Sequence, residues 1–428
     1  MVAGGLVVSD VPRSEVIASY EIETSLPLQQ AAEALAGEQS TGTFIRVERE
    51  SDELRARSAA QVVSVDELPL SGASALPGAK GDPDKRRRAL LRLRFPLDNF
   101  GPSLPNLLAA VAGNLFELRE LAAIKLIGLD LPSEFAERYP GPAFGVEGTR
   151  RLMGRSEGAM IGTIVKPSIG LRPDELAELV GELATAGIDF IKDDELQGNG
   201  AIAPFEERVK AVMPVLLRHA DRTGTMPMYA FNITDDLERM RHNHDLVLEQ
   251  GGTCIMVCVN MVGFAGTEWV RRHSQLPIHG HRAMLGSMMR SPQLGFGYGA
   301  WQALARVAGV DHLHTNGISN KFYESDAEVL ASIRQVRTPM LDHRPIVPVL
   351  SSGQWAGLAH DTHAAVDTTD VLVLAGGGIH GHPHGAAAGV EAMRTAWHAA
   401  EHGESFAAAV ERSPALRAAV DTFGGVRG

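Results

Sequence analysis

One lysine and three carboxylates follow an apolar segment in 186-AGIDFIKDDELQGNG-200. The adjacent carboxylates of Asp194 and Glu195 repel each other unless a cation lies between them, and hard oxygen ligands of this kind suit Mg²⁺. Lys192 does not fit such a site unmodified, because an ammonium group only donates hydrogen bonds. Lys192 must therefore pair with the acids or be converted into an oxygen ligand. The alternative is a surface acidic patch paired with Lys192, which the buried-looking segment before it disfavours.

Reactive residue types also follow the other apolar segments of the second part of the chain. They are Lys166, Asn232, Asn260, His281, Arg282, His314, Ser351 and the glycines 376 to 378. The glycine-rich segment 374-LAGGGIHGHPHG-385 suits a phosphate cradle built from backbone N–H groups, and Arg282 could hold a second anion by a forked contact. A structural protein has no need for this repetition, so the pattern indicates an enzyme.

Histidines spaced two residues apart offer a rival reading. The sets are His279/His281, His312/His314 and His380/His382/His384. In a strand, such pairs share a face and can bind Zn²⁺. With 16 histidines in 428 residues, some pairs arise by chance, so we keep zinc as the lesser alternative.

The elements that must position these residues are eight apolar segments separated by helical ones. The segments cover residues 160–167, 188–194, 226–234, 253–260, 276–283, 311–317, 345–352 and 370–378. Near-continuous apolar strands alternating with helices predict a buried parallel sheet. Eight of them over roughly 240 residues favour a (β/α)8 TIM barrel over an open sheet, with the polar residues at the carboxyl ends of its strands.

The N-terminal part has another pattern. Residues 16–22, 43–48 and 88–96 alternate apolar and polar side chains, and residues 27–38 have helical spacing. Strands with one solvent-exposed face predict an antiparallel sheet whose other face is covered by helices. We therefore expect an α/β protein in which an α+β, ferredoxin-like domain (1–140) precedes the barrel domain (141–428).

Composition narrows the class of partner. A net charge of -12 argues against nucleic acid and acidic membranes as partners. The two cysteines, Cys254 and Cys258, lie in one apolar segment and are expected to be buried, reduced thiols. The first 15 residues have neither a basic start nor a sustained apolar core, and the chain contains no apolar run of ~18 residues. We therefore expect no signal peptide, no membrane span and a cytoplasmic enzyme acting on a small molecule.

Together these residues resemble the large subunit of the RuBisCO superfamily. The segments that carry the resemblance are 162-GTIVKPSIGL-171, 188-IDFIKDDE-195, 281-HRAM-284, 311-DHLHTNGISNK-321, 347-VPVLSSG-353 and 376-GGGIHGHPHG-385. Near the N-terminus, 38-EQSTGTF-44 and 113-GNLFEL-118 resemble the segments that reach into the partner's active site in a homodimer. The match spans almost the whole chain.

The resemblance implies a role for each matching position. Lys192 would carry a CO₂-derived carbamate and complete a Mg²⁺ site with Asp194 and Glu195, and Lys166 would exchange protons with an enediolate. Lys321 would neutralise a carboxylate. The residues implied in substrate binding are His281, Arg282 and His314, then Ser351, Gly353, Gly376 and Gly377, and from the neighbouring subunit Glu38, Thr43 and Asn114.

Departures from the family pattern indicate a RuBisCO-like protein of the non-carboxylating form IV type. Ser168 stands where carboxylases have a second lysine, Phe44 replaces a tryptophan, Ser352 replaces a glycine, and the loop 316-NGISNKFYES-325 is altered. The retained residues are Lys166, His314, Lys321 and Asn114.

This retained set favours loss of CO₂ from a 3-oxo sugar-acid phosphate, such as 3-oxo-isoapionate 4-phosphate, through a metal-stabilised enediolate. The alternative reaction is that of an enolase or isomerase acting on a methylthio-sugar phosphate in sulfur salvage. A non-enzymatic relative is a third alternative, which the complete metal set disfavours because unused buried charge is costly.

Overall fold

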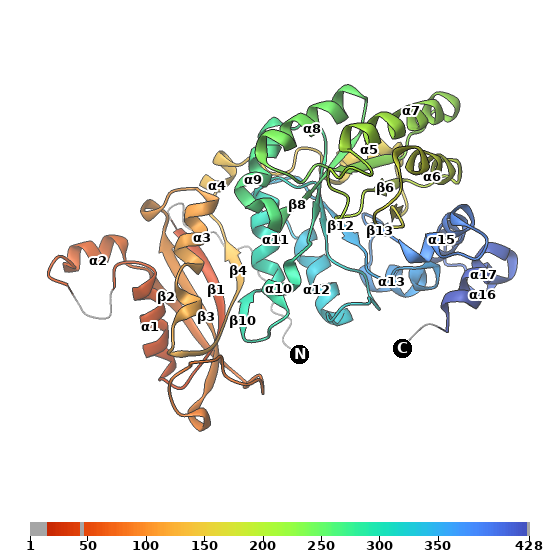
Figure 1. Cartoon of the computed structure of the whole chain (residues 1–428). Coiled ribbons are helices and arrows are strands. Elements are labelled where there is room, and N and C mark those ends of the chain that lie inside the picture. Colours follow the sequence, from red (N-terminus) through yellow and green to blue (C-terminus); the bar gives the residue numbers. More distant parts are fainter. Residues whose placement is uncertain (1–14, 43–46, 426–428) are drawn as a thin grey trace. The chain divides into compact units, whose positions relative to one another are not determined.

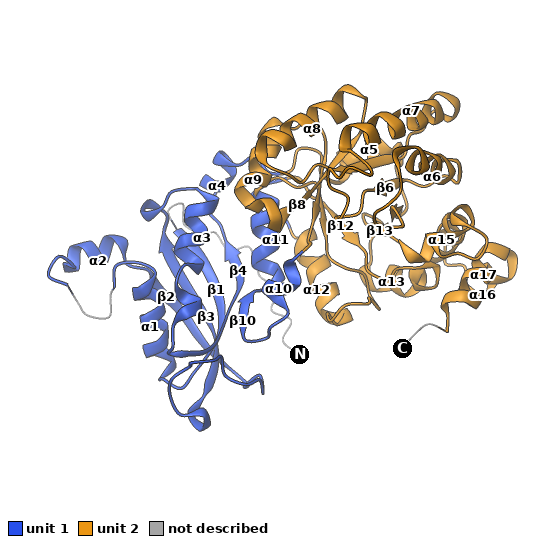
Figure 2. Cartoon of the chain, viewed as in Figure 1, with its two compact units in different colours: residues 1–141, 284–307, 339–343 blue, residues 142–283, 308–338, 344–428 orange. Residues whose placement is uncertain are grey.

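The computed structural model describes residues 15–42 and 47–425 (Figure 1). The chain divides into two compact units (Figure 2). Unit 1 comprises residues 1–141, 284–307 and 339–343, and unit 2 comprises residues 142–283, 308–338 and 344–428. Two short segments from the second half of the sequence thus belong to unit 1, and the contiguous limits 1–140 and 141–428 stay a prediction.

Unit 1 is built on a five-stranded sheet in the order β10-β4-β1-β3-β2. Its strands are β1 (Glu15–Thr24), β2 (Gln61–Leu68), β3 (Arg87–Pro96), β4 (Leu121–Asp130) and β10 (Leu294–Phe296). Its helices are α1 (Leu28–Glu38), α2 (Asp52–Ser58), α3 (Leu104–Ala112), α4 (Glu134–Arg138), α10 (Leu285–Met289) and α11 (Tyr298–Val307). Strands β1 to β4 pair antiparallel, and β10 adds a parallel edge to β4.

The alternation of β3 shows why this segment forms a strand. Ala89, Leu91, Leu93 and Phe95 are buried, whereas the arginines between them are not. The order β1, α1, β2, β3, α3, β4 with sheet order β4-β1-β3-β2 is the ferredoxin-like arrangement, so this prediction is confirmed. The strand expected over 43–48 falls mainly on residues 43–46, outside the described part, and residues 47–48 form no strand.

Unit 2 contains a closed parallel barrel in the order β5-β6-β7-β8-β9-β11-β12-β13. The strands are β5 (Met160–Ile164), β6 (Phe190–Lys192), β7 (Met228–Asn232), β8 (Cys254–Cys258), β9 (Ile278–His281), β11 (His312–His314), β12 (Val347–Leu350) and β13 (Leu372–Leu374). Each of the eight predicted apolar segments supplies one strand, in sequence order, so the barrel is confirmed.

Helices separate the strands of unit 2 and surround its barrel. They are α5 (Gly145–Met153), α6 (Pro173–Thr185), α7 (Phe205–Thr223), α8 (Leu237–Glu249), α9 (Val259–His273), α12 (Asp326–Arg337), α13 (Ala359–Val366), α14 (Gly377–His380), α15 (Ala386–Glu401), α16 (Phe406–Arg412) and α17 (Pro414–Phe423). No helix of the described residues combines the length and the apolar character needed to cross a bilayer.

Inward-facing side chains fill the barrel. Met160, Phe190, Met228, Met256 and Val349 belong to one buried cluster. Both cysteines are buried and free, as predicted, and burial raises the pKa of each thiol. The interior is therefore a packed core, which leaves the chemistry to the carboxyl ends of the strands.

Candidate active site

Lys192 ends β6 and is completely buried. Its Nζ donates to the Asp193 carbonyl oxygen over 2.7 Å and lies 3.9 Å from Oε2 of Glu195. Burial lowers the pKa of Lys192, although the charges of Glu195 and Asp194 oppose this change. A buried amine with a lowered pKa is more readily neutral, and only the neutral amine can add CO₂.

Lys166 lies beside the other predicted ligand, Asp194. Its Nζ donates to Oδ2 of Asp194 and to Oγ of Ser168, each over 2.6 Å. Burial opposes ionisation of Asp194, but the hydrogen bonds from Lys166 and from the Leu196 N–H outweigh it, and the pKa of Asp194 is lowered. Each of the two proposed metal-binding carboxylates thus lies near a lysine amine, Asp194 near Lys166 and Glu195 near Lys192.

Asp193 has a different role from its two acidic neighbours. It is fully buried and accepts hydrogen bonds from the Tyr229 hydroxyl (2.6 Å), the Asn232 N–H (2.9 Å) and the Arg208 guanidinium (3.2 Å). Alternation along an extended chain places Asp193 opposite Lys192 and Asp194. Its carboxylate therefore ties β6 to β7 and α7 and is not available as a ligand.

His281, the last residue of β9, lies beside Glu195. Its Nδ1 accepts the Ala283 N–H over 3.1 Å, which places the proton of the neutral ring on Nε2, 3.5 Å from Oε2 of Glu195. Burial, with help from the charges of Lys192 and Arg282, keeps the pKa of His281 well below its usual value. His281 is therefore a neutral donor at the edge of the carboxylate site.

A chain of buried histidines begins on the opposite side of the barrel. The Thr149 hydroxyl donates to the Gly145 carbonyl (2.6 Å), so it accepts from Nε2 of His312 (2.8 Å). Burial lowers the pKa of His312 to about 3, so its ring is neutral and its Nδ1 accepts from Nδ1 of His279 (3.4 Å). The threonine thus fixes the tautomers of both rings.

The same chain reaches the predicted substrate residues. Nε2 of His279 then accepts from Nε2 of His314 over 2.8 Å, and Nδ1 of His314 accepts from the Ser351 hydroxyl over 3.1 Å. Burial lowers the pKa values of His279 and His314 well below their usual range. The hydroxyl oxygen of Ser351 consequently presents lone pairs, which can accept a hydrogen bond from a substrate hydroxyl.

Arg282 follows β9 and forms a forked ion pair. Its Nη1 and Nη2 lie 3.3 Å and 2.5 Å from the two carboxylate oxygens of Glu324, whose side chain is 3% exposed. Asn316 donates to the same carboxylate over 2.5 Å. The predicted anion-binding arginine therefore already holds a carboxylate of its own chain.

Lys321 and the glycine loops lie on the same rim. A Cβ at Gly353 would stand 3.4 Å from the backbone nitrogen of Lys321, and a Cβ at Gly376 would stand 3.4 Å from Cε of Lys166. Gly377 faces open space, whereas Gly378 has no room for a side chain beside Trp355. Lys321 is thus close to Gly353, and Lys166 is close to Gly376.

The predicted partner-reaching residues belong to unit 1. Glu38 ends α1, and Asn114 precedes a short 3-10 turn. With its amide oxygen turned toward the Asn114 N–H, Gln39 accepts a hydrogen bond over 2.9 Å, so these two segments are neighbours. Thr43 lies outside the described residues.

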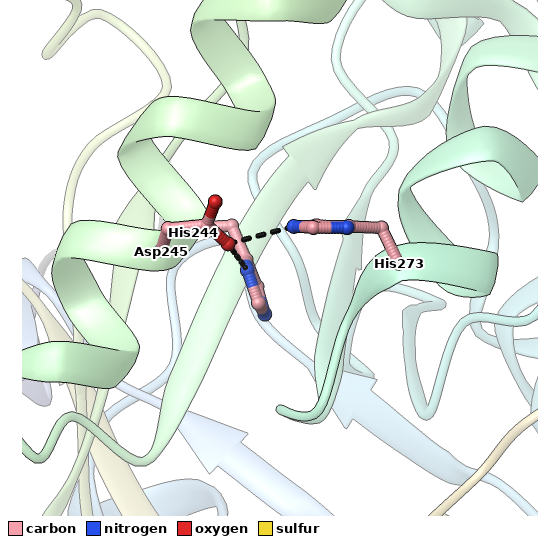
Figure 3. Close-up of side chains that lie close together, drawn as sticks. All are labelled: His244, Asp245 and His273. Carbon is pink, nitrogen blue, oxygen red and sulfur yellow. Dashed lines mark hydrogen bonds and ion pairs between the residues drawn. The ribbon is translucent and has the colours of Figure 1, made fainter.

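Among the described residues, a set of three metal-ligand side chains close enough to share one ion is His244, Asp245 and His273 (Figure 3). None of them belongs to the histidine sets considered for zinc. Nδ1 of His244 and Nε2 of His273 both meet Oδ1 of Asp245, at 2.9 Å and 2.6 Å. Nε2 of His244 accepts the Gln275 N–H, so its proton occupies Nδ1, where a metal would have to bind. Hydrogen bonding between α8 and α9 explains this cluster better than a metal ion.

The structure thus gathers most of the predicted barrel residues on one rim and adds three that sequence reasoning missed. Glu324 contacts Arg282, Asn316 contacts Glu324, and Ser168 contacts Lys166. No sequence pattern marked Glu324 as a site residue, because it lies in a loop between two residues that are exposed. Ser168 was noted as a departure, but its contact with Lys166 was not foreseen.

Comparison with known proteins defines the class. Residues 10–135 match the N-terminal domain of the ribulose bisphosphate carboxylase large chain, and residues 145–423 match its catalytic domain. A (β/α)8 enzyme with this rim and this preceding sheet is a RuBisCO-type protein. The chain belongs to the ribulose bisphosphate carboxylase large-chain family, and the predicted resemblance to its RuBisCO-like members is confirmed.

Two relatives and one solved structure are similar to the chain over nearly their full length. The 3-oxo-isoapionate-4-phosphate transcarboxylase/hydrolase of Xanthobacter autotrophicus is 53% identical, covering 95% of this chain and 98% of that protein. The 3-oxo-isoapionate-4-phosphate decarboxylase of Rhizobium rhizogenes is 41% identical, covering 96% and 99%. The crystal structure of a rubisco-like protein from Burkholderia fungorum is 44% identical, covering 96% and 100%, with a TM-score of 0.89.

Proposed function

We propose that the protein breaks the bond between carbon and carboxylate in a 3-oxo sugar-acid phosphate, such as 3-oxo-isoapionate 4-phosphate, in a Mg²⁺-dependent reaction. The observation that carries this proposal is the hydrogen bond between Lys166 and Asp194, which places a proton donor at the carboxylate site. The names of the two 3-oxo-isoapionate-4-phosphate enzymes at 53% and 41% identity support the same substrate.

The donor set fits Mg²⁺ once Lys192 is modified. Asp194 and Glu195 supply carboxylate oxygens, and addition of CO₂ to the neutral Lys192 amine, with loss of a proton, supplies carbamate oxygens. Oxygen ligands are those that this ion prefers. When bound, the ion stabilises negative charge that develops on substrate oxygens.

The residues of the chain then have distinct tasks. The bond to the carboxylate breaks, its electron pair stays on the carbon next to the ketone, and CO₂ leaves. The Lys166 ammonium group can return a proton to that carbon. His281 donates from Nε2 to a substrate oxygen, and Lys321 faces the departing carboxylate. Ser351, Gly353, Gly376 and Gly377 hold the hydroxyl and phosphate groups.

A second outcome is favoured by the higher identity to the transcarboxylase/hydrolase. An enediolate is nucleophilic at both carbons, so CO₂ that is retained can add to the other one. The product is a new 3-oxo acid, which water can cleave. Both outcomes share the first bond cleavage and the residues that perform it.

Product analysis with an isotopically labelled carboxylate separates these outcomes. Purified protein would be incubated with Mg²⁺, bicarbonate and labelled 3-oxo-isoapionate 4-phosphate. Labelled CO₂ indicates the decarboxylase, and label in a new carboxylic acid after cleavage indicates the transcarboxylase/hydrolase. Turnover of a methylthio-sugar phosphate without turnover of the oxo acid would refute both and favour the enolase or isomerase. Asp194→Asn serves as the inactive control.

The predicted homodimer has its own test. Glu38, Thr43 and Asn114 of the neighbouring chain would complete each site. Mixing inactive Lys166→Met protein with inactive Glu38→Gln protein should restore part of the activity, because hybrid dimers regain one intact site. No recovery after exchange of subunits would contradict shared sites. Cytoplasmic location stays a prediction.

A further inference from the structure

Glu324 is a buried carboxylate in an otherwise exposed part of the loop that carries Lys321. Its neighbours Tyr323 and Ser325 are exposed, while its own side chain is 3% exposed. Such burial requires compensation, because an unpaired buried charge is strongly unfavourable. The compensation comes from Arg282, which meets both of its oxygens.

The surrounding contacts hold this pair in place. Asn316 donates to Glu324 over 2.5 Å, and the carboxamide oxygen of Asn316 accepts from Ser352 over 2.8 Å. Asn320 donates to the Glu324 carbonyl over 3.0 Å. Displacing the carboxylate would therefore break contacts of the loop, of the arginine and of the Ser352 turn together.

A guanidinium fork binds one carboxylate or one phosphate in the same geometry. Arg282 is the forked anion site at its end of the rim, and Glu324 already supplies the anion there. The glycine loop with Gly376 and Gly377 follows β13, which β11 and β12 separate from β9 in the barrel, and it remains for a phosphate of the substrate. The rim thus offers one phosphate position where the sequence suggested two.

We propose that Glu324 acts as a built-in anion that determines specificity, so that the site accepts sugar acids or ketoses with one phosphate and gains nothing from a second. This inference rests on the proposed function only for the position of the single phosphate. The proposed substrate carries one phosphate and therefore agrees with this selectivity. Glu324 touches the arginine and not the reacting atoms, so it is a positioning residue.

Calorimetric titration of the full-length protein with Mg²⁺ and bicarbonate tests the proposal. The probes are ribulose 5-phosphate and ribulose 1,5-bisphosphate, which differ by one phosphate. For the unmodified protein, the two dissociation constants should agree within about threefold. A bisphosphate that binds at least about tenfold more tightly would overturn the proposal without any variant, since a bidentate contact to a freed arginine is strong.

The variant Glu324→Gln removes the charge and keeps the shape. It should bind the bisphosphate at least about tenfold more tightly than the unmodified protein does and the monophosphate within about threefold. Equal gains for both ligands, or no gain for either, would refute the selectivity. Glu178→Gln, an exposed position on α6, changes the net charge equally and should alter neither constant.

A double variant identifies the released group. Replacing both Arg282 and Glu324 by methionine should abolish the bisphosphate gain, because no guanidinium is freed. A retained gain would show that another cation binds the second phosphate and would overturn the role of Arg282. If the two ribulose phosphates bind as expected but the 3-oxo sugar-acid phosphate is not turned over, only the proposed function is contradicted. If that substrate is turned over but the unmodified protein binds the bisphosphate tightly, only this inference is contradicted.

Discussion

Nζ of Lys166 lies 2.6 Å from Oδ2 of Asp194, so the predicted proton donor and a predicted metal ligand share a hydrogen bond. The same amine donates to Ser168, which fixes its direction. Lys166 is therefore held at the carboxylate site by two contacts before any substrate binds. Proton transfer and charge stabilisation can then act on adjacent atoms of one substrate.

Replacing Lys166 by methionine should lower kcat by about 10²- to 10⁴-fold, the range for loss of a general acid. Mg²⁺ affinity should not fall, because Asp194 loses only a competing cation. Turnover assays and calorimetry measure the two effects. Lys210→Met, which removes an exposed ion pair on α7, is the matched control. A parallel loss of Mg²⁺ binding in Lys166→Met would contradict the assigned role.

Replacing Lys192 by methionine should abolish the effect of bicarbonate on Mg²⁺ binding. The unmodified protein should bind Mg²⁺ more tightly with bicarbonate, since a carbamate adds oxygen ligands to those of Asp194 and Glu195. Calorimetric titration with and without bicarbonate measures the difference. Bicarbonate-independent Mg²⁺ binding by the unmodified protein would argue against the carbamate.

Replacing Asp193 by asparagine should destabilise the protein by about 3–5 kcal/mol, because Arg208 is then left as a buried charge without its carboxylate. Glu195→Gln, two residues away and 36% exposed, should change stability by less than about 1 kcal/mol while weakening Mg²⁺ binding. Thermal unfolding of both variants measures the contrast. Equal destabilisation would refute the division of roles between the acids.

Acid should destabilise the protein through its buried histidines. The pKa of His312 is about 3 in the folded state and about 6.5 in an unfolded chain. Because the folded-state value is lower, the stability is fully present above pH ~6.5 and is lost as the pH falls toward ~3. Glutamine at 312 can still donate to Thr149, and unfolding measured from pH 7 to 4 should show a shallower decline for His312→Gln. An unchanged slope would exclude His312 as a contributor.

Much of the fold could be predicted, because the spacing of apolar residues along the sequence indicates where strands and helices form. The eight apolar segments became the eight barrel strands in order, and the alternation of residues 88–96 became β3. The short strand β10 could not be foreseen, since it leaves the barrel sequence to pair with β4. Such pairing depends on contacts between residues distant in sequence, which periodicity does not record.

The sequence by itself determined which residues reach the active rim, because each strand ends within its predicted apolar segment, the polar residues follow, and parallel strands share one rim. It also contained the alternation that separates Asp193 from Lys192 and Asp194. Only the tertiary structure decided that Arg282 is paired with Glu324, 42 residues further along the chain. That pairing depends on the path of a loop and on the burial of one carboxylate, and both follow from packing rather than from local sequence.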